Sequence, residues 1–323
     1  MFTLKLYVTH FFFLQSVENP ASFQAEKINH LFNVFNVAAA AMLLLVCVLV
    51  TYICIKFRQK KDDAREASQT TGNKKLEALM IGIPTLLLAY FFWQTVSVEN
   101  AVAAPLHPAQ QPDVIITGHQ WWWEVEYPAS KVITANEVHL PAGKHILMEL
   151  RTADVIHDWW VPQLGNKMDM IPNTKNYLQV DINKPGDYFG ACSEFCGAQH
   201  AWMRIHVIAQ SQNDFNNWLD SNTTNAHQPT DSLAMRGAYL FQTKTCASCH
   251  RIQGRNAVSN YGPDLTHVAS RQQLLTGLID NNETELFKWI NHPQQIKEDA
   301  HMPDFIFDKD SVQAIAHYLA QLK

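Results

Sequence analysis

Two long apolar runs constrain the fold of this chain more than any other feature. Leu31 to Ile55 is almost wholly apolar, and Ala78 to Val96 contains no charged residue. A helix of about 20 apolar residues crosses the hydrocarbon core of a bilayer, and Pro84 in the second run is tolerated there because neighbouring helices can satisfy the freed carbonyl. The alternative, two buried helices of a soluble domain, fits such lengths poorly. We therefore predict a two-helix transmembrane anchor over residues 31–98.

The loop between the two runs is strongly basic, whereas residues 99–130 contain no Lys or Arg. Because cytoplasmic loops of membrane proteins carry an excess of basic residues, this loop is predicted to be cytoplasmic. Everything after Asn100 is then expected on the periplasmic face of a bacterial inner (plasma) membrane, in a multi-pass protein surrounded by lipid. The basic residues of the loop are Lys56, Arg58, Lys60, Lys61, Arg65, Lys74 and Lys75.

Residues 1–30 are predicted to be an N-terminal leader or a possible signal peptide. Lys5 precedes a short apolar segment, Phe11 to Leu14, and Pro20 to Ser22 is compatible with a nearby cleavage site. The apolar segment is short and interrupted, so an uncleaved leader fits the sequence nearly as well.

The six cysteines fall into three pairs, and each pair has its own explanation. One pair lies in the first apolar run and the other two lie in motifs typical of metal and haem sites, so no pair remains for a disulfide framework. The net charge of −5 is mild and the membrane loop is the one basic run, which argues against nucleic acid as a partner. A chain of 323 residues has room for two compact domains besides the anchor.

Residues 105–212 consist of short β-rich runs broken by Pro, Gly and Asn. This pattern predicts an all-β sandwich or barrel, for which about 100 residues suffice. A linker rich in Asn, Ser and Thr is expected at 213–230, and residues 231–323 become helical, with Asp310 or Ser311 as the N-cap of the last helix. The predicted class is a multi-domain membrane protein with two transmembrane α-helices, an all-β Greek-key domain and an all-α domain.

Residues 192–203, with the sequence CSEFCGAQHAWM, place two thiols, an imidazole and a thioether in one short loop. Two cysteines four positions apart can hold their sulfurs close enough to bridge two metal ions. His157, followed by two tryptophans and Pro162, is the best candidate for a second imidazole. Zinc is the main alternative for a Cys/His set, but a thioether such as Met203 is a soft ligand that suits copper. The candidate ligands are His157, Cys192, the Glu194 carbonyl, Cys196, His200 and Met203.

The sequence CASCH at residues 246–250 is the attachment motif for a c-type haem. The thiols of Cys246 and Cys249 would add to the haem vinyl groups, and His250 would be the proximal iron ligand. Met302 is the expected opposite ligand, and a His/Met pair raises the haem potential toward that of an electron carrier. The alternatives for that position are His267, His292 and His301.

Together these motifs resemble subunit II of a haem–copper cytochrome c oxidase of the caa3 type, which carries a fused class I cytochrome c. The pattern C-S-E-x-C-G-x-x-H-x-x-M, the upstream H-x-W-x-x-P and the two-helix anchor carry the resemblance over residues 30–210, and CxxCH with a later Met-Pro carries it over 231–323. The resemblance implies a cupredoxin barrel in which the six ligands named above hold a binuclear copper A centre. It also implies a magnesium ion at the subunit I border, bound in part by the Glu194 side chain.

The resemblance gives three further residues a role. Trp121 would be the residue through which electrons enter, Glu77 would lie at the mouth of a proton-uptake channel, and Asp169 would lie near the subunit I border. Core packing is the alternative for Trp121, and a solvated helix cap is the alternative for Glu77. Asn173 and Arg204 stand where the family usually has Gly and Pro, and neither is a proposed ligand.

The predicted function is electron transfer within a terminal oxidase. Electrons would pass from an external donor, either a cytochrome c or a membrane cytochrome complex, through haem c and copper A to subunit I, where O2 is reduced to water with proton pumping. Subunit III is a further expected partner, and no catalytic O2-reducing site is expected in this chain. A flexible linker would raise the effective concentration of the tethered cytochrome to roughly the mM range. The main alternative is a membrane-anchored copper/haem electron carrier that serves a different reductase.

Overall fold

The computed structural model describes residues 17–58, 72–105 and 108–323, and these belong to two compact units. One unit is formed by residues 27–102, and the other joins the residues up to 26 with residues 103–323. Residues 1–16 of the expected leader lie outside the described residues, as do Lys60, Lys61 and Arg65 of the basic loop.

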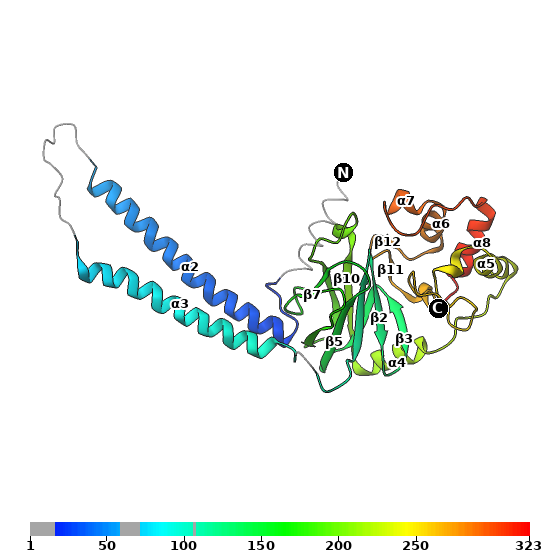
Figure 1. Ribbon diagram of the computed structural model, residues 1–323, viewed down its shortest axis with the longest axis horizontal. Coiled ribbons are helices and arrows are strands. Elements are labelled where there is room, and N and C mark those ends of the chain that lie inside the picture. Colours follow the sequence, from blue (N-terminus) through cyan, green and yellow to red (C-terminus); the bar gives the residue numbers. More distant parts are fainter. Residues whose placement is uncertain (1–16, 59–71, 106–107) are drawn as a thin grey trace. The chain divides into compact units, whose positions relative to one another are not determined.

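Helices α2 (Phe23–Lys56) and α3 (Lys74–Val102) supply the predicted anchor, blue and cyan in Figure 1. Both are long and apolar enough to cross a membrane, and the most apolar window is 0% buried in α2 and 6% buried in α3. Apolar side chains therefore face outward, as contact with lipid requires. The two helices touch through Phe35 and Phe91, whose ring centroids lie 4.8 Å apart. The two predicted membrane helices are thus present, and each extends beyond its apolar run.

The β domain is a sandwich of two five-stranded sheets, shown in green in Figure 1. Its strands are β1 (Val114–His119), β2 (Trp122–Tyr127), β3 (Val132–Ala135), β4 (Glu137–Pro141), β5 (His145–Thr152), β6 (His157–Trp160), β7 (Met168–Met170), β8 (Asn176–Asp181), β9 (Gly186–Cys192) and β10 (Arg204–Gln210). One sheet has the order β3-β2-β1-β5-β8 and the other β4-β10-β9-β6-β7. The pairs β1–β5 and β4–β10 are parallel, so the connections cross over between the sheets.

Alternating side chains on β2 build the core between the sheets. Trp123, Val125 and Tyr127 are buried, and the residues between them are only partly covered, because successive side chains of a strand point to opposite faces. The Trp123 indole packs edge-on against Trp159 of β6 at 5.2 Å, and its N–H donates to the Arg204 carbonyl at 2.9 Å. This aromatic core supports β6, which carries His157, and β10, which follows the predicted metal-binding loop.

The residues at and just before the start of α2 pack on the sandwich. Ser22 forms a β-bridge with Ile182, and its hydroxyl donates to the Leu164 carbonyl at 2.7 Å. Gln24 is 1% exposed and exchanges two hydrogen bonds with Asp181, of 2.7 and 2.9 Å. The part of the predicted leader around Ser22 is therefore structurally part of the β domain.

Helix α4 (Gln212–Asn222) occupies the first part of the segment expected to be a linker. Ser211 caps its N-terminus with a side-chain hydrogen bond. Phe215, Trp218 and Leu219 are three and four positions apart, so they lie on one face of the helix, and this face packs on the sandwich core. The structure therefore has a helix where a linker was expected. The segment is polar in overall composition, and its apolar residues form one face only once the helix is present.

The C-terminal domain is helical, as predicted, and is coloured yellow to red in Figure 1. Its elements are α5 (Ser232–Thr243), β11 (Gln273–Leu274), β12 (Ile279–Asp280), α6 (Glu283–Asn291), α7 (Pro293–Ile296) and α8 (Lys309–Leu319). Helices α5 and α8 cross closely at Gly237, where a Cβ atom would meet the Ala314 carbonyl oxygen at 1.9 Å. Glycine is required at this crossing for steric reasons.

The three long helices of this domain each begin at a polar N-cap. The side chains of Asp231, Asn282 and Asp308 accept hydrogen bonds from backbone N–H groups in the first turns of α5, α6 and α8. The predicted cap of α8, Asp310 or Ser311, was wrong. Asp308 caps this helix and accepts from the N–H of Ser311 at 2.9 Å.

His317 on α8 joins the beginnings of α5 and α6 to the last helix. Its Nδ1 lies 2.9 Å from Glu283 Oε2, and its Nε2 lies 3.0 Å from Asp231 Oδ2. The hydrogen bonds with Glu283 and Asp231 raise the pKa of His317 above its ordinary value of 6.5. A raised histidine pKa stabilises the fold fully below the unfolded-state pKa, and the effect is lost as pH rises through the folded-state pKa.

We therefore predict that His317→Gln lowers the melting temperature of the C-terminal domain (the haem domain below) near pH 6, and that the difference from the unchanged protein shrinks toward pH 9. The expected loss is at most a few degrees, because the ion pairs are largely exposed to solvent. Scanning calorimetry of the haem-loaded protein at both pH values measures it, with His227→Gln at an exposed site as the control. Equal losses at the two pH values would contradict the ionic origin of the effect.

Candidate copper and haem sites

Four potential ligand atoms meet where the loop after β9 passes the start of β6. The Sγ atoms of Cys192 and Cys196 lie 3.8 Å apart as free thiols. His157 Nδ1 lies 3.8 Å from Cys192 Sγ, and His200 Nδ1 lies 3.6 Å from Cys196 Sγ. Among the described residues, one group of three His, Cys, Asp or Glu ligand atoms falls within 4.8 Å, and it consists of His157 and the two cysteines, all buried.

Met203 and Glu194 complete the set. The Met203 thioether sulfur lies 3.8 Å from Cys196 Sγ, and the Glu194 carbonyl oxygen lies 3.3 Å from Cys192 Sγ. Met203 is fully buried, whereas the Glu194 side chain is exposed. The structure thus brings together all six groups named from the sequence. We refer to these groups as the thiol cluster: His157, Cys192, the Glu194 carbonyl, Cys196, His200 and Met203.

Strand pairing explains why residues distant in sequence meet at the thiol cluster. Strand β9 pairs with β6 so that Cys192 lies opposite Trp159, which brings His157 close to the first thiol. The Cys192 N–H donates to the Met203 carbonyl at 2.9 Å, so the loop returns to β10 beside the place where it left β9. The single-turn helix η1 (His200–Trp202) fills the interval. Two strand ends and one turn therefore fix the six groups.

The donor set fits copper. Two sulfurs 3.8 Å apart have the separation found around one tetrahedral metal with metal–sulfur bonds of about 2.3 Å. The hydrogen bond between the thiols lowers the pKa of Cys192 and raises that of Cys196, and a bound cation would favour ionisation of both. Thiolate, imidazole and thioether ligands favour copper over magnesium or calcium.

Asp154 orients His157, and sequence reasoning missed it. Asp154 Oδ1 accepts from His157 Nε2–H at 2.8 Å, which leaves Nδ1 directed at Cys192. Its other oxygen accepts from the Gln120 backbone N–H at 2.6 Å. Burial alone would raise the pKa of Asp154, but these hydrogen bonds outweigh it and lower the pKa below its usual value. The one sequence signal was its position three residues before His157.

We predict that Asp154→Ala weakens copper binding by about 10- to 100-fold, because a metal-ligating histidine that loses its carboxylate partner also loses its fixed orientation. Asp154→Asn retains an acceptor and is expected to lose less. Competition of the purified protein with a copper chelator measures the affinity. Asp113→Ala removes a carboxylate that accepts from the Leu147 N–H elsewhere in the β domain, and it is the matched control. Equal affinities of Asp154→Ala and this control would contradict the role of Asp154.

Trp121 lies between the thiol cluster and the haem domain. Its indole N–H donates to the Cys196 carbonyl at 2.9 Å, and the Gln120 side-chain amide donates to the same oxygen at 2.7 Å. Gly197 permits this approach, because a Cβ there would lie 2.8 Å from the indole. On the other side, the indole and the His301 ring have centroids 5.9 Å apart. Trp121 is thus placed to connect two sites, although its role in receiving electrons stays a prediction.

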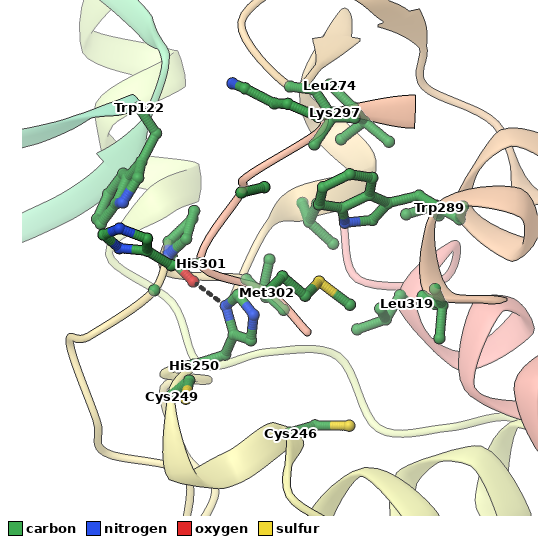
Figure 2. Close-up of a pocket in the computed structure, with 18 of the residues that line it drawn as sticks. Trp122, Cys246, Cys249, His250, Leu274, Trp289, Lys297, His301, Met302 and Leu319 are labelled. Atoms are coloured by element: carbon green, nitrogen blue, oxygen red, sulfur yellow. Dashed lines mark hydrogen bonds between the residues drawn. The ribbon is translucent and has the colours of Figure 1, made fainter. Parts of the chain in front are cut away.

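A pocket in the haem domain brings the predicted haem residues together. Cys246, Cys249 and His250 line it from the turn after α5, and Met302 lines it from the loop before α8. Figure 2 shows the His250 and Met302 side chains in the same pocket, with the two cysteines below His250. The apolar part of the wall includes Phe241, Leu274, Leu286, Trp289, Ile290 and Leu319.

The His250 ring is held with one nitrogen available. Its Nδ1–H donates to the Pro263 carbonyl at 2.8 Å, and Gly262 lies against the ring, where a Cβ would be 2.8 Å from Cε1. Burial lowers the pKa of His250, so the imidazole is neutral and Nε2 keeps a lone pair for a metal. Of the alternatives to Met302 among the described residues, His301 also lines the pocket, whereas His267 and His292 lie elsewhere.

Two basic residues of this pocket were also missed. Arg271 and Lys297 both line it, and Arg271 Nε is buried without a hydrogen-bond partner in the described part of the chain. The Arg271 guanidinium also donates to the Asp264 carbonyl. A buried guanidinium N–H without a partner suits a carboxylate, and haem carries two propionates. The thiols, the imidazole, the thioether and the Arg271 guanidinium therefore fit a covalently attached haem.

The remaining predicted residues do not join these sites. Glu77 is exposed in the first turn of α3. Asp169 is exposed on β7, opposite Asp158 of β6, and burial together with the Asp169 carboxyl raises the pKa of Asp158 above its usual value. The described residues contain no carboxylate cluster that would hold magnesium within this chain alone.

Comparisons with known proteins account for all three parts of the chain. Residues 11–93 and 129–210 match the transmembrane and periplasmic domains of cytochrome c oxidase subunit II, and residues 234–323 match cytochrome c. Cytochrome c oxidase subunit 2 of Alkalihalophilus pseudofirmus is 29% identical over 90% of this chain and 86% of the relative. The Synechocystis subunit 2 is 30% identical over 67% of this chain and 77% of the relative. The solved periplasmic domain of subunit II from Bradyrhizobium japonicum is 30% identical over 36% of this chain and 95% of that chain, with a TM-score of 0.34.

The matched parts follow the predicted order of membrane anchor, β domain and cytochrome domain. The likeness to subunit 2 relatives runs along most of the chain rather than through one domain. The resemblance found in the motifs is thereby confirmed, as is the expected place in an oxidoreductase complex. The chain belongs to the cytochrome c oxidase subunit II family and carries a cytochrome c domain at its C-terminal end.

Proposed function

We propose that this chain is the electron-transfer subunit of a haem–copper terminal oxidase and connects an external donor to subunit I. Bound haem c and copper would each take up and release one electron at a time. The observation that best supports this path is the position of Trp121. Its indole is hydrogen-bonded to the Cys196 carbonyl and lies 5.9 Å, between ring centroids, from His301 of the haem pocket. One conjugated side chain therefore spans the interval between the two sites.

The thiol cluster is proposed to hold a binuclear copper A centre. Two thiolates can each contact two metal ions, and the remaining donors lie on both sides of the sulfur pair. His157 lies beside Cys192, whereas His200 and Met203 lie beside Cys196. The strands and Asp154 hold these groups in a buried site, which limits rearrangement when the charge of the centre changes.

The haem-domain pocket is proposed to hold haem c through Cys246 and Cys249, with His250 and Met302 as axial ligands. The Pro263 carbonyl fixes the His250 ring. The apolar wall would exclude water from a bound haem, and ligation by the Met302 thioether together with the His250 imidazole would favour the reduced iron and raise the potential. The buried Nε–H of Arg271 could donate a hydrogen bond to a haem propionate.

Subunit I is the proposed electron acceptor, where O2 is reduced to water with proton pumping, and subunit III is a further proposed partner. A cytochrome c or a membrane cytochrome complex is the proposed donor. The basic loop supports a cytoplasmic position for itself and a periplasmic position for both domains. The exposed Glu194 carboxylate is available for a magnesium ion whose other oxygen ligands would come from subunit I.

Purification from native membranes in mild detergent tests this function. We expect the chain to bring with it an O2-consuming complex that contains further haems, with one covalent haem and two copper ions held by each copy of this chain, besides the copper of the O2-reducing subunit. Recovery of the chain with copper and haem c, but without an O2-reducing subunit, would instead favour the alternative carrier for a different reductase.

Glu77 at the start of α3 is proposed to lie at the mouth of a proton-uptake channel. We predict that Glu77→Gln slows O2 consumption by the complex several-fold, because a neutral amide cannot bind and release a proton. The copper and haem spectra should not change. Glu99→Gln, at the other end of the same helix, is the matched control. Unchanged O2 consumption in Glu77→Gln would mean that this carboxylate only stabilises the N-terminus of α3 and takes no part in proton uptake.

A further inference from the structure

The haem domain contacts the β domain through a buried ammonium group. Lys297, which precedes Met302 in the haem domain, is 5% exposed, and its Nζ donates to the Trp121 carbonyl at 2.8 Å (the side chain is labelled in Figure 2). Burying an ammonium is costly unless it is hydrogen-bonded, and burial lowers the pKa of Lys297 to about 8. Beside it, the Gln199 amide of the metal-binding loop donates to the Glu298 carbonyl at 2.7 Å.

A buried carboxylate makes a second contact between the same two domains. Glu137 on β4 is 4% exposed, and its Oε1 accepts from the backbone N–H groups of Gln272 and Gln273 at 2.7 and 2.9 Å. The Thr276 hydroxyl, on the same haem-domain segment, donates to the Trp202 carbonyl. Each domain therefore buries one charge whose hydrogen-bond partners belong to the other domain.

The chain between the two domains is itself bound to the haem domain. Ala226 is 4% exposed in the haem-domain core, and its N–H donates to the Gln253 carbonyl at 3.1 Å. The Arg255 guanidinium donates to the His227 carbonyl at 3.0 Å. The preceding residues form α4, which packs on the sandwich. The segment that connects the domains is therefore bound at both ends and short, in contrast to the flexible linker expected from the sequence.

We propose that Lys297 and Glu137 are positioning residues that hold the haem domain in one fixed arrangement on the β domain. Charged groups are depleted from the buried core of protein interfaces, because each costs desolvation there unless it has fixed hydrogen-bond partners. Two buried charges, each bonded to backbone atoms of the other domain, are suited to an interface that stays closed. The fixed arrangement rests on these contacts alone. Its role in electron transfer from haem c to copper rests on the proposed function.

In the fixed arrangement, Trp121 is buried between the β domain and the haem domain. Trp121 is 7% exposed, its carbonyl accepts from Lys297, and its ring faces His301. A separate cytochrome would have to displace the haem domain to reach it. Trp121 therefore receives electrons from the haem domain of its own chain, and an external donor must dock on the haem domain instead.

Amide hydrogen exchange of the full-length protein, with copper and haem bound, tests the fixed arrangement. In the unchanged protein we expect strong protection of the Gln272 and Gln273 amides. Lys297→Met should speed their exchange about tenfold, or about 1.4 kcal/mol, although Lys297 does not touch these amides. Such a remote effect requires the interface to open as a unit. Lys297→Arg retains a cation and should restore much of the protection.

Lys288→Met is the matched control, because Lys288 is exposed on α6 and pairs with Glu285 inside the haem domain. Fast exchange of the two amides in the unchanged protein would overturn the proposal. So would exchange in Lys297→Met that equals the exchange in Lys288→Met. Neither result bears on whether the chain serves an oxidase, which copurification with an O2-reducing subunit decides separately.

The viscosity dependence of electron transfer gives a second readout. After rapid photoreduction of the haem, we expect the rate of copper reduction in the unchanged protein to be independent of added glycerol. The double variant Glu137→Leu/Lys297→Met should transfer electrons more slowly as viscosity rises, because its haem domain must find the β domain by diffusion. A rate that already falls with viscosity in the unchanged protein would overturn the fixed arrangement.

Discussion

Cys196→Ser is expected to abolish the delocalised mixed-valence copper signal and to slow O2 consumption by on the order of 100-fold or more. Cys196 lies within 3.8 Å of three other groups of the thiol cluster, Cys192, His200 and Met203. A serine hydroxyl is a hard, protonated group at neutral pH and cannot replace a bridging thiolate. Loss of an outer-shell partner alone costs about 10- to 100-fold at metal sites, so loss of a bridging ligand should cost more.

Low-temperature EPR of the oxidised protein, with copper content measured on the same sample, tests this expectation. The unchanged protein should contain two copper ions that share one unpaired electron, and Cys196→Ser should contain at most one, with an ordinary mononuclear signal. Cys54→Ser makes the same chemical change in α2, outside the cluster, and should leave the signal intact. A mononuclear signal in the unchanged protein would overturn the copper A assignment while leaving the haem site in place.

The ligands themselves were predictable from the sequence because most of them share one short loop. Cys192, Cys196, His200 and Met203 cannot be far apart, whatever the fold, and only His157 had to be brought in from another strand. The local motif around His157 identified it, and the pairing of β6 with β9 is the physical reason that it reaches the first thiol. The haem motif was predictable in the same way, since its two thiols and its imidazole are adjacent.

The residues that position these ligands were not predictable from local patterns. Asp154 resembles any loop carboxylate until β6 places His157 against it. Arg271, Lys297 and Glu137 are residue types common on protein surfaces. Lys297 and Glu137 are buried against segments distant in sequence, and the Nε of Arg271 is buried at the haem-domain pocket. Sequence spacing identifies residues that are close along the chain. The burial and the hydrogen bonds of these residues depend instead on contacts between distant segments and between domains. Helix α4, at the start of the expected linker, was not predicted for a related reason: its few apolar residues lie among many polar ones.

Met302→His is expected to lower the reduction potential of haem c by on the order of 100 mV. Met302 lines the pocket that contains His250, and an imidazole stabilises ferric iron more than a thioether does. For a one-electron couple, 59 mV corresponds to a tenfold change in equilibrium constant. A fall of about 120 mV would therefore reduce the ratio of reduced to oxidised haem about 100-fold at a fixed donor potential, and O2 consumption would become limited by reduction of the haem.

An optical redox titration of the purified complex measures this shift directly. Met235→His introduces the same side chain at an exposed position on α5 of the same domain, so it controls for the added histidine. If His301 were the axial ligand instead, Met302→His would leave the potential near that of the unchanged protein, and His301→Ala would change it. His301 faces Trp121, however, with ring centroids 5.9 Å apart. A His301→Ala variant with an unchanged potential and slower copper reduction would therefore place Met302 on the iron and His301 between the two sites.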